Sequence, residues 1–191
     1  AEEDELQELR PALFYDKNGV ELMLGRSVEA IYRAGGRVIL DGGEALAYDG
    51  LVLATGARVR VPPVPGIDLA NVFLLRTVDD ARRLKQRLAA ARDVVVVGGG
   101  FIGLELAATA RILGKTVTVL EAAPRLMGRV VAPAISAYFL ELHRALGSTV
   151  RLETPVAALV GENGAVVAVE TAGGERIPAD TVIVGVGVVP N

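Results

Sequence analysis

The sequence predicts an α/β protein built as a Rossmann-like, three-layer domain with a β-meander, accompanied by an incomplete second copy. A strand, a glycine-rich turn, a helix and a second strand follow one another within residues 94–121. Apolar runs such as 51–53 and 182–184 are continuous, which is typical of parallel strands covered on both faces. The mean hydropathy of +0.42 fits such a covered sheet. An internal repeat, described below, predicts the second copy.

The glycine-rich turn follows the strand 94–97 and reads Gly98-Gly99-Gly100-Phe101-Ile102-Gly103. Gly98 allows the tight turn, Gly100 lets a pyrophosphate approach the backbone, and Gly103 lets the helix lie close to the strand. The pyrophosphate would then lie at the helix start, beside Phe101 and Ile102, where unpaired N–H groups favour negative charge. We expect a dinucleotide site. The alternative is a βαβ unit whose glycines are incidental.

Glu121 ends the second strand of this unit, 18 positions after Gly103. A carboxylate there can accept both hydroxyl groups of an adenosine ribose, and it would repel a 2′-phosphate. The position therefore predicts NAD rather than NADP. Alternatively, Glu121 is an acid of a solvated loop, and Arg125 and Arg129 are close enough in sequence to weaken the discrimination.

Composition excludes several classes of function. A net charge of −3 and an aromatic content of 4% argue against nucleic-acid binding. The run 94–110 contains Glu105 and four glycines, which fits a strand and a helix better than a membrane span. The chain opens on acidic residues, from which we expect no signal peptide, and its 191 residues contain no cysteine for a disulfide or a thiolate metal site. We expect a cytoplasmic protein without a metal centre.

The internal repeat relates residues 42–56 to residues 173–187 at a constant offset of 131. Both segments read as a turn, a short strand, an aspartate, a buried strand and a glycine, and hairpin patterns precede both. Only the second copy has a βαβ unit ahead of its meander, because residues 1–18 form an acidic, partly helical stretch. We infer that residues 1–60 end a first dinucleotide-binding domain whose opening unit lies upstream. Chance similarity between glycine-rich hairpins is the alternative.

The proline-rich connector 61–66 predicts a boundary between an incomplete domain, 1–66, and a nucleotide-binding domain, 67–191. We expect a basic helix over 81–91, capped by Thr77 or Asp79, and a helix over 133–146. A strand at 149–152 should pair with the strand 116–120. His143 is expected at the surface and Met127 in the core. The buried stripe expected on the helix 133–146 consists of Ile135, Phe139, Leu142 and Leu146.

The sequence resembles the pyridine nucleotide-disulfide oxidoreductases, which carry two dinucleotide-binding domains. More closely, it resembles FAD-dependent NADH:ferredoxin/rubredoxin reductases of the putidaredoxin-reductase and dioxygenase ferredoxin-reductase type. The second domain lacks a Cys-x-x-Cys pair, which favours this branch over thioredoxin reductases. The resemblance runs from about Pro11 onward, and its stretches are 14–15, 19–22, 48–58, 75–81, 98–105, 124–129 and 184–191.

The resemblance implies an enzyme that passes electrons from NADH through FAD to a [2Fe–2S] ferredoxin or a rubredoxin. In this family an FAD-binding domain is interrupted by an NAD-binding domain. The chain would hold the end of the first FAD segment and a complete NAD domain. The cofactors carry the chemistry, so no residue is expected to be catalytic.

The resemblance also implies roles for individual residues. On the flavin side, Thr55, Gly56 and Arg58 would lie beside FAD, and the backbone of Val28 would lie near its adenine. The alternative for Thr55 and Gly56 is that they simply end a buried strand.

On the nicotinamide side, Glu105 would contact the carboxamide and Gly187 would let the nicotinamide pass close to the backbone. Alternatively, Glu105 is an ordinary cap at the third helical position. Arg125 and Arg129 would line the adenosine end, with Arg129 preferred.

Two other functions fit the same residues. One is an NADH oxidase, a peroxidase or a CoA-disulfide reductase, whose cysteine would lie upstream. The other is a nucleotide-binding module that binds NADH without turnover. The oligomeric state does not follow from the sequence, although an exposed strand edge within residues 1–60 could drive dimerisation.

Overall fold

The computed structural model describes residues 8–191, which form two compact units, one over residues 8–54 and one over residues 55–191. We call them unit 1 and unit 2. The acidic opening of the chain lies outside the described residues. Within residues 8–191, no helix has the length and apolar character that a membrane crossing requires.

Unit 2 is built on a parallel five-stranded sheet with the order β5-β12-β6-β7-β8. A three-stranded antiparallel meander, β11-β10-β9, and a two-stranded ribbon, β13-β4, complete its strands. Its elements are β4 (Ala57–Val59), β5 (Val72–Leu74), α2 (Val78–Ala90), β6 (Asp93–Val97), α3 (Phe101–Ile112), β7 (Thr116–Leu120), α4 (Pro133–Ala145), β8 (Thr149–Arg151), β9 (Val156–Glu162), β10 (Ala165–Thr171), β11 (Arg176–Pro178), β12 (Thr181–Val184) and β13 (Val188–Pro190).

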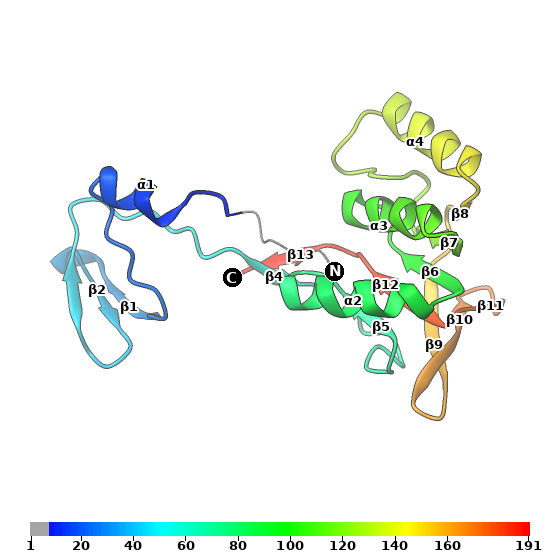
Figure 1. Ribbon diagram of the computed structural model, residues 1–191, viewed down its shortest axis with the longest axis horizontal. Helices are drawn as coiled ribbons and strands as arrows, with labels where there is room; N and C mark the ends of the chain where they lie inside the picture. Colours follow the sequence, from blue (N-terminus) through cyan, green and yellow to red (C-terminus); the bar gives the residue numbers. More distant parts are fainter. Residues whose placement is uncertain (1–7) are drawn as a thin grey trace. The chain divides into compact units, whose positions relative to one another are not determined.

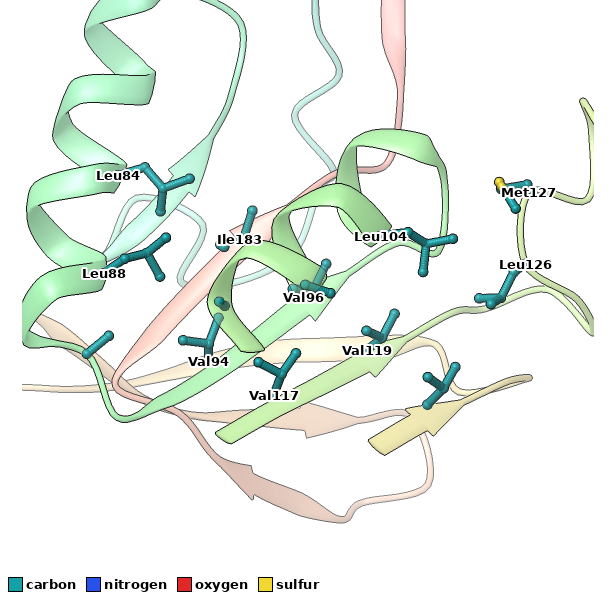
Figure 2. Packing of buried hydrophobic residues seen from close by; sticks show 14 residues of the cluster. Leu84, Leu88, Val94, Val96, Leu104, Val117, Val119, Leu126, Met127 and Ile183 are labelled. Carbon is teal, nitrogen blue, oxygen red and sulfur yellow. The ribbon is translucent and has the colours of Figure 1, made fainter. Parts of the chain in front are cut away.

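The sheet lies between a helical layer and the meander (Figure 1). Successive side chains of a strand point to opposite faces, so β6 serves both layers. Val94 and Val96 pack with the buried leucines of α2 and α3 (Figure 2), whereas Val95 packs with the meander. The structure thereby confirms the three-layer α/β architecture and explains why the strands read as continuous apolar runs.

Helix α2 begins three residues earlier than expected, and Thr77 is its cap. The Thr77 hydroxyl accepts a hydrogen bond from the Asp80 N–H at 3.2 Å, and the Asp80 carboxylate accepts one from the Thr77 N–H at 2.9 Å. This capping box rules out Asp79 as the cap. The bonds from Thr77 hold the pKa of Asp80 down at about 2.

The predicted stripe of α4 is only partly correct. Phe139 and Leu142 are half-buried, but Ile135 and Leu146 are 45% and 50% exposed. The buried residues of this helix are Ser136 and His143, so the prediction that His143 lies at the surface is wrong. Met127 is buried, as expected. On the buried face of the helix, the hydroxyl of Ser136 donates a hydrogen bond to the Leu126 carbonyl at 2.6 Å.

Unit 1 contains a meander with the strand order β1-β2-β3, in which Val38 and Leu40 are buried. Its elements are α1 (Ala12–Lys17), β1 (Val28–Tyr32), the 3₁₀ turn η1 (Arg33–Gly35), β2 (Arg37–Leu40) and β3 (Ala45–Ala47).

The pairing register confirms the internal repeat. In unit 1, Arg37 pairs with Ala47 and Val38 with Leu46. In unit 2, the residues 131 positions later form the same pairs, β10 against β11, from Ala168↔Pro178 through Val169↔Ile177 to Glu170↔Arg176. Chance similarity of two hairpins would not conserve the register residue by residue.

The prediction of a buried strand at 51–53 is wrong for the structure. No strand forms at 50–56, and Val52 is 87% exposed. The equivalent strand of unit 2, β12, is paired with β5 on one side and β6 on the other. The described residues of unit 1 offer no parallel neighbours, so the same sequence pattern stays extended and unpaired.

Candidate nucleotide site

The glycine-rich turn joins β6 to α3 and depends on two close approaches of backbone to backbone. Gly98 has a positive φ of 106°, and a Cβ on it would lie 2.6 Å from the Gly185 carbonyl oxygen. A Cβ on Gly103 would overlap the carbonyl oxygen of Gly98. These two glycines therefore hold the turn against β12 and the helix against the strand, which agrees with the roles expected for them.

Gly100 differs from the other two glycines of the motif because the space above it is open. A Cβ on Gly100 would meet one described atom within 4 Å, the Gly185 oxygen at 3.9 Å. Gly100 is the N-cap of α3, and no side chain caps this helix. The first helical hydrogen bond joins Leu104 N–H to the Gly100 carbonyl at 3.0 Å. The N–H groups of Phe101, Ile102 and Gly103 therefore have no partner within the helix and can bind an anion.

Glu121 lies at the carboxyl end of β7 and is fixed by two backbone donors. The Gly99 N–H donates to its Oε2 at 2.6 Å, and the Ala123 N–H donates to its Oε1 at 2.8 Å. An ionised carboxylate has about four acceptor positions, so each oxygen can still accept a hydroxyl group. The carboxylate is thus oriented beside the glycine-rich turn and is not a solvated loop acid.

The loop that follows Glu121 packs against the glycine-rich turn at Gly99. The Gly99 carbonyl accepts a hydrogen bond from the Met127 N–H at 2.9 Å, and Leu126 is fully buried against Gly99. The guanidinium of Arg125 donates to the Val131 carbonyl at 2.8 Å, to the Ser136 hydroxyl at 3.0 Å and to the Gly128 carbonyl. The guanidinium of Arg125 therefore bonds to its own loop and to the adjacent helix α4. This placement does not support the expectation that it lines the adenosine end.

The guanidinium of Arg129 lies beside Gly187, which follows β12. Its Nη2 is 3.8 Å from the position that a Cβ on Gly187 would take. Gly187 is exposed and has a positive φ of 109°, so its backbone is open to a ring system that passes nearby. The structure thus brings together two expected site residues, Arg129 and Gly187.

Glu105 lies on α3 and is exposed. Because the helix begins at Phe101, Glu105 occupies the fifth helical position, and the first turn carries no acidic residue. The alternative interpretation of Glu105 as a cap at the third position is therefore wrong. Its expected role at the nicotinamide stays a prediction.

Two of the residues expected on the flavin side, Thr55 and Arg58, form hydrogen bonds with residues 190–191. The Thr55 hydroxyl donates to the Asn191 carbonyl, and the Arg58 Nη1 donates to the Pro190 carbonyl, both at 3.3 Å. Gly56 has a positive φ of 72° and precedes β4. Val28 belongs to unit 1, where it begins β1 and pairs with Leu40. The side-chain contacts of Asn191 were not predicted, because its partners Thr55 and Arg58 lie 136 and 133 residues away in sequence.

No group of His, Asp or Glu side chains within residues 8–191 is arranged to hold a metal ion. The site consists instead of a polar backbone cradle, one oriented carboxylate and one guanidinium. These are the groups that bind a phosphate-bearing nucleotide.

Comparisons with known proteins agree with this geometry. Residues 2–191 match the family model of the pyridine nucleotide-disulphide oxidoreductases. The chain is 45% identical to rhodocoxin reductase of Rhodococcus erythropolis, covering 96% of this chain and 43% of that protein. It is 46% identical to the ferredoxin–NAD(+) reductase component of the anthranilate 1,2-dioxygenase system of Burkholderia cepacia, with 96% and 45% covered. A rubredoxin–NAD(+) reductase of Pseudomonas putida is 40% identical, with 95% and 47% covered.

Solved structures show the same relationship. The ferredoxin reductase for the CYP199A2 system from Rhodopseudomonas palustris superposes with a TM-score of 0.88 at 43% identity, covering 96% of this chain and 45% of that chain. The chain thus spans less than half the length of these relatives. The family match over nearly every residue shows that the chain belongs to the pyridine nucleotide-disulphide oxidoreductase family, whose members use FAD and NAD(H).

Proposed function

We propose that the chain is the NADH-binding part of an FAD-dependent reductase, and that the whole protein passes electrons from NADH to a ferredoxin or a rubredoxin. The observation that carries the proposal is the Glu121 carboxylate, fixed 2.6 Å from the Gly99 nitrogen beside an uncapped helix start. Relatives named as ferredoxin–NAD(+) and rubredoxin–NAD(+) reductases support the choice of acceptor.

The described residues fit NADH. The free N–H groups at the start of α3 would bind the pyrophosphate, and the open space above Gly100 would admit it. Glu121 would accept the ribose hydroxyl groups, and its negative charge would disfavour a 2′-phosphate. Glu105 and Gly187 would lie beside the nicotinamide, with Arg129 over Gly187.

The fit to FAD is partial, because residues 8–191 contain one glycine-rich strand–turn–helix unit and Glu121 belongs to it. Thr55, Gly56, Arg58 and the backbone of Val28 would supply only part of the flavin contacts. When bound, the two cofactors supply hydride transfer and single-electron transfer. The residues of the chain bind and orient the cofactors, and none of them is required as a general acid or base. A cytoplasmic location stays a prediction.

The test is anaerobic mixing of the full-length protein with NADH, followed by addition of a [2Fe–2S] ferredoxin or a rubredoxin. We expect the flavin absorbance to bleach with NADH, less readily with NADPH, and to return as the carrier is reduced. Bleaching without reduction of either carrier would contradict the proposal. In a separate assay that supplies oxygen, peroxide or CoA disulfide, consumption of one of them at the rate of NADH oxidation would instead identify an oxidase, a peroxidase or a CoA-disulfide reductase.

A further inference from the structure

The ribbon formed by β4 and β13 joins two segments that the repeat makes equivalent (Figure 1). Residues 56–60 and 187–191 are related by the offset of 131, and the central pair of the ribbon, Arg58↔Val189, consists of equivalent residues. The Arg60 N–H donates to the Gly187 carbonyl at 3.0 Å, and the Asn191 N–H donates to the Gly56 carbonyl at 3.1 Å. Because Arg60 is equivalent to Asn191 and Gly187 to Gly56, exchanging the two copies of the repeat turns each of these bonds into the other. The ribbon therefore has local two-fold pseudosymmetry.

This ribbon is too short to be stable through its ladder alone. Each strand has three residues, and Pro190 has no N–H to donate. An isolated two-stranded ribbon is marginal in water even when it is longer. Additional bonds are therefore needed to hold Gly56 and Gly187 at a fixed separation.

Asn191 supplies most of these bonds, through both its backbone and its side chain. Its Nδ2 donates to the Thr55 carbonyl at 3.0 Å, and its Oδ1 accepts from Arg58 Nη1 at 3.3 Å. Its carbonyl accepts from the Thr55 hydroxyl at 3.3 Å. The side-chain pattern requires an amide, because it places a donor against a carbonyl and an acceptor against a guanidinium. An aspartate would put a negative oxygen against the Thr55 carbonyl.

Arg76 ties the same turn to the helical layer. Its Nε donates to the Ala57 carbonyl at 2.8 Å, and its Nη2 lies 3.8 Å from the position of a Cβ on Gly56. Its own N–H donates to the Asp80 carboxylate at 3.1 Å, directly before the cap of α2. Arg76 thus connects the Gly56 turn to the start of a helix that packs on the parallel sheet.

We propose that Asn191 and Arg76 are positioning residues for electron transfer, and that they hold the Thr55–Gly56 turn at a fixed place relative to Gly187. This inference rests on the proposed function, which puts the turn on the flavin side and Gly187 on the nicotinamide side. We call the hydrogen bonds that Asn191 and Arg76 make to residues 55–58 the clasp. A displacement of about 1 Å between reacting groups can cost about a hundred-fold in rate, so the clasp acts on the rate of hydride transfer. It leaves the nucleotide cradle at Gly100 and Glu121 untouched.

The test uses the full-length protein in rapid anaerobic mixing with NADH, which separates the limiting rate of flavin reduction from the dissociation constant of NADH. Asn191→Ala and Asn191→Asp should each lower the limiting rate about ten-fold and change the dissociation constant less than two-fold. Arg76→Met should act in the same way, and Arg76→Lys should restore part of the rate because lysine keeps one donor. Arg82→Ala, which removes an exposed arginine of α2, is the control and should match the wild type.

Hydrogen exchange on the protein without NADH gives a second readout. The Asn191 and Arg60 amides should exchange at least about ten-fold faster in Asn191→Ala than in the wild type. If the variants keep their flavin and reduce it at the wild-type limiting rate, the clasp is only structural and the inference is wrong. Should Asn191→Ala fail to fold, the Arg76 pair carries the same test. A wild-type protein that NADH does not reduce would contradict the proposed function instead, whatever the exchange rates of the two amides.

Discussion

The Gly99 N–H donates a hydrogen bond of 2.6 Å to Oε2 of Glu121, so the glycine-rich turn and the acid at the end of β7 form one structural unit. Gly99 is buried, and a Cβ on it would lie 3.1 Å from that same oxygen. The bond fixes the carboxylate before any ligand arrives. A group held in its binding conformation loses little entropy on binding, so this bond would favour the ribose contact that we propose for Glu121.

Replacement of Glu121 by glutamine should weaken NADH binding about ten-fold and reduce the preference for NADH over NADPH. Hydrogen bonds to a charged group contribute about 1.5–3 kcal/mol, and about 1.4 kcal/mol corresponds to ten-fold in affinity. The amide also removes the charge that repels a 2′-phosphate. Isothermal titration calorimetry with both nucleotides measures the effect, and Glu162→Gln at the exposed end of β9 is the control. An unchanged ratio of the two affinities would show that Glu121 only supports the turn.

Alanine substitutions at Gly100 and Gly103 should have different effects, the first on NADH binding and the second on the free energy of unfolding. Gly100→Ala should leave the free energy of unfolding within about 0.5 kcal/mol, since its Cβ enters open space, yet it should abolish NADH binding. Gly103→Ala should lower the free energy of unfolding by about 1–3 kcal/mol, because its Cβ overlaps the Gly98 carbonyl. Urea unfolding and calorimetry on both variants provide the comparison. Normal NADH binding by Gly100→Ala would place the pyrophosphate elsewhere.

The parts of the fold that the sequence predicted correctly are those with local signals. The glycine spacing at 98–103, the strand 116–120 before Glu121 and the helix cap, which the sequence narrowed to Thr77 or Asp79, each depend on neighbours within a few positions. The meander repeat was also predictable, because its register follows from a constant offset of 131.

The errors arose where a distant partner decides the outcome. The α4 stripe was predicted from hydrophobic periodicity, but the buried face of the helix holds two polar residues, Ser136, which bonds to the distant Leu126 carbonyl, and His143. Residues 51–53 have the sequence of a covered strand, yet they have no parallel neighbours to pair with among the described residues. The loop bonds of Arg125 and the contacts of Asn191 depend on side-chain geometry that no periodicity records.

Asp180 should contribute to stability above about pH 4 and lose that contribution in acid. Burial disfavours its ionised form, but hydrogen bonds from the Arg92 and Asp93 N–H groups and from Thr181 outweigh burial and lower the pKa of Asp180. A carboxyl group whose pKa is lower in the folded state stabilises the fold above its unfolded pKa of about 3.9, and this effect disappears as pH falls below that value. Asp180→Asn should cost about 1 kcal/mol at pH 7 in a partly solvated site.

Urea unfolding at pH 7 and at pH 3 measures this contribution. The difference in unfolding free energy between Asp180→Asn and the wild type should shrink at pH 3, because the carboxyl group of the unfolded chain, with a pKa of about 3.9, is then largely protonated. Asp68→Asn provides a control at another aspartate of unit 2. An equal difference at both pH values would mean that the charge of Asp180 contributes nothing.

His143 should make the fold less stable as pH falls below about 6.5. Its side chain is buried, its Nδ1 has no hydrogen-bond partner among the described residues, and desolvation lowers its pKa. A histidine whose pKa is lower in the folded state takes up its proton more readily when unfolded, so stability is full above about pH 6.5 and declines below it. The loss should approach about 1.4 kcal/mol per pH unit at most.

His143 is the only histidine of the 191 residues, so no other imidazole titrates in this pH range. In His143→Gln the unfolding free energy should therefore change much less between pH 7.5 and pH 5.5, whereas parallel profiles for the two proteins would mean that folded His143 accepts the proton.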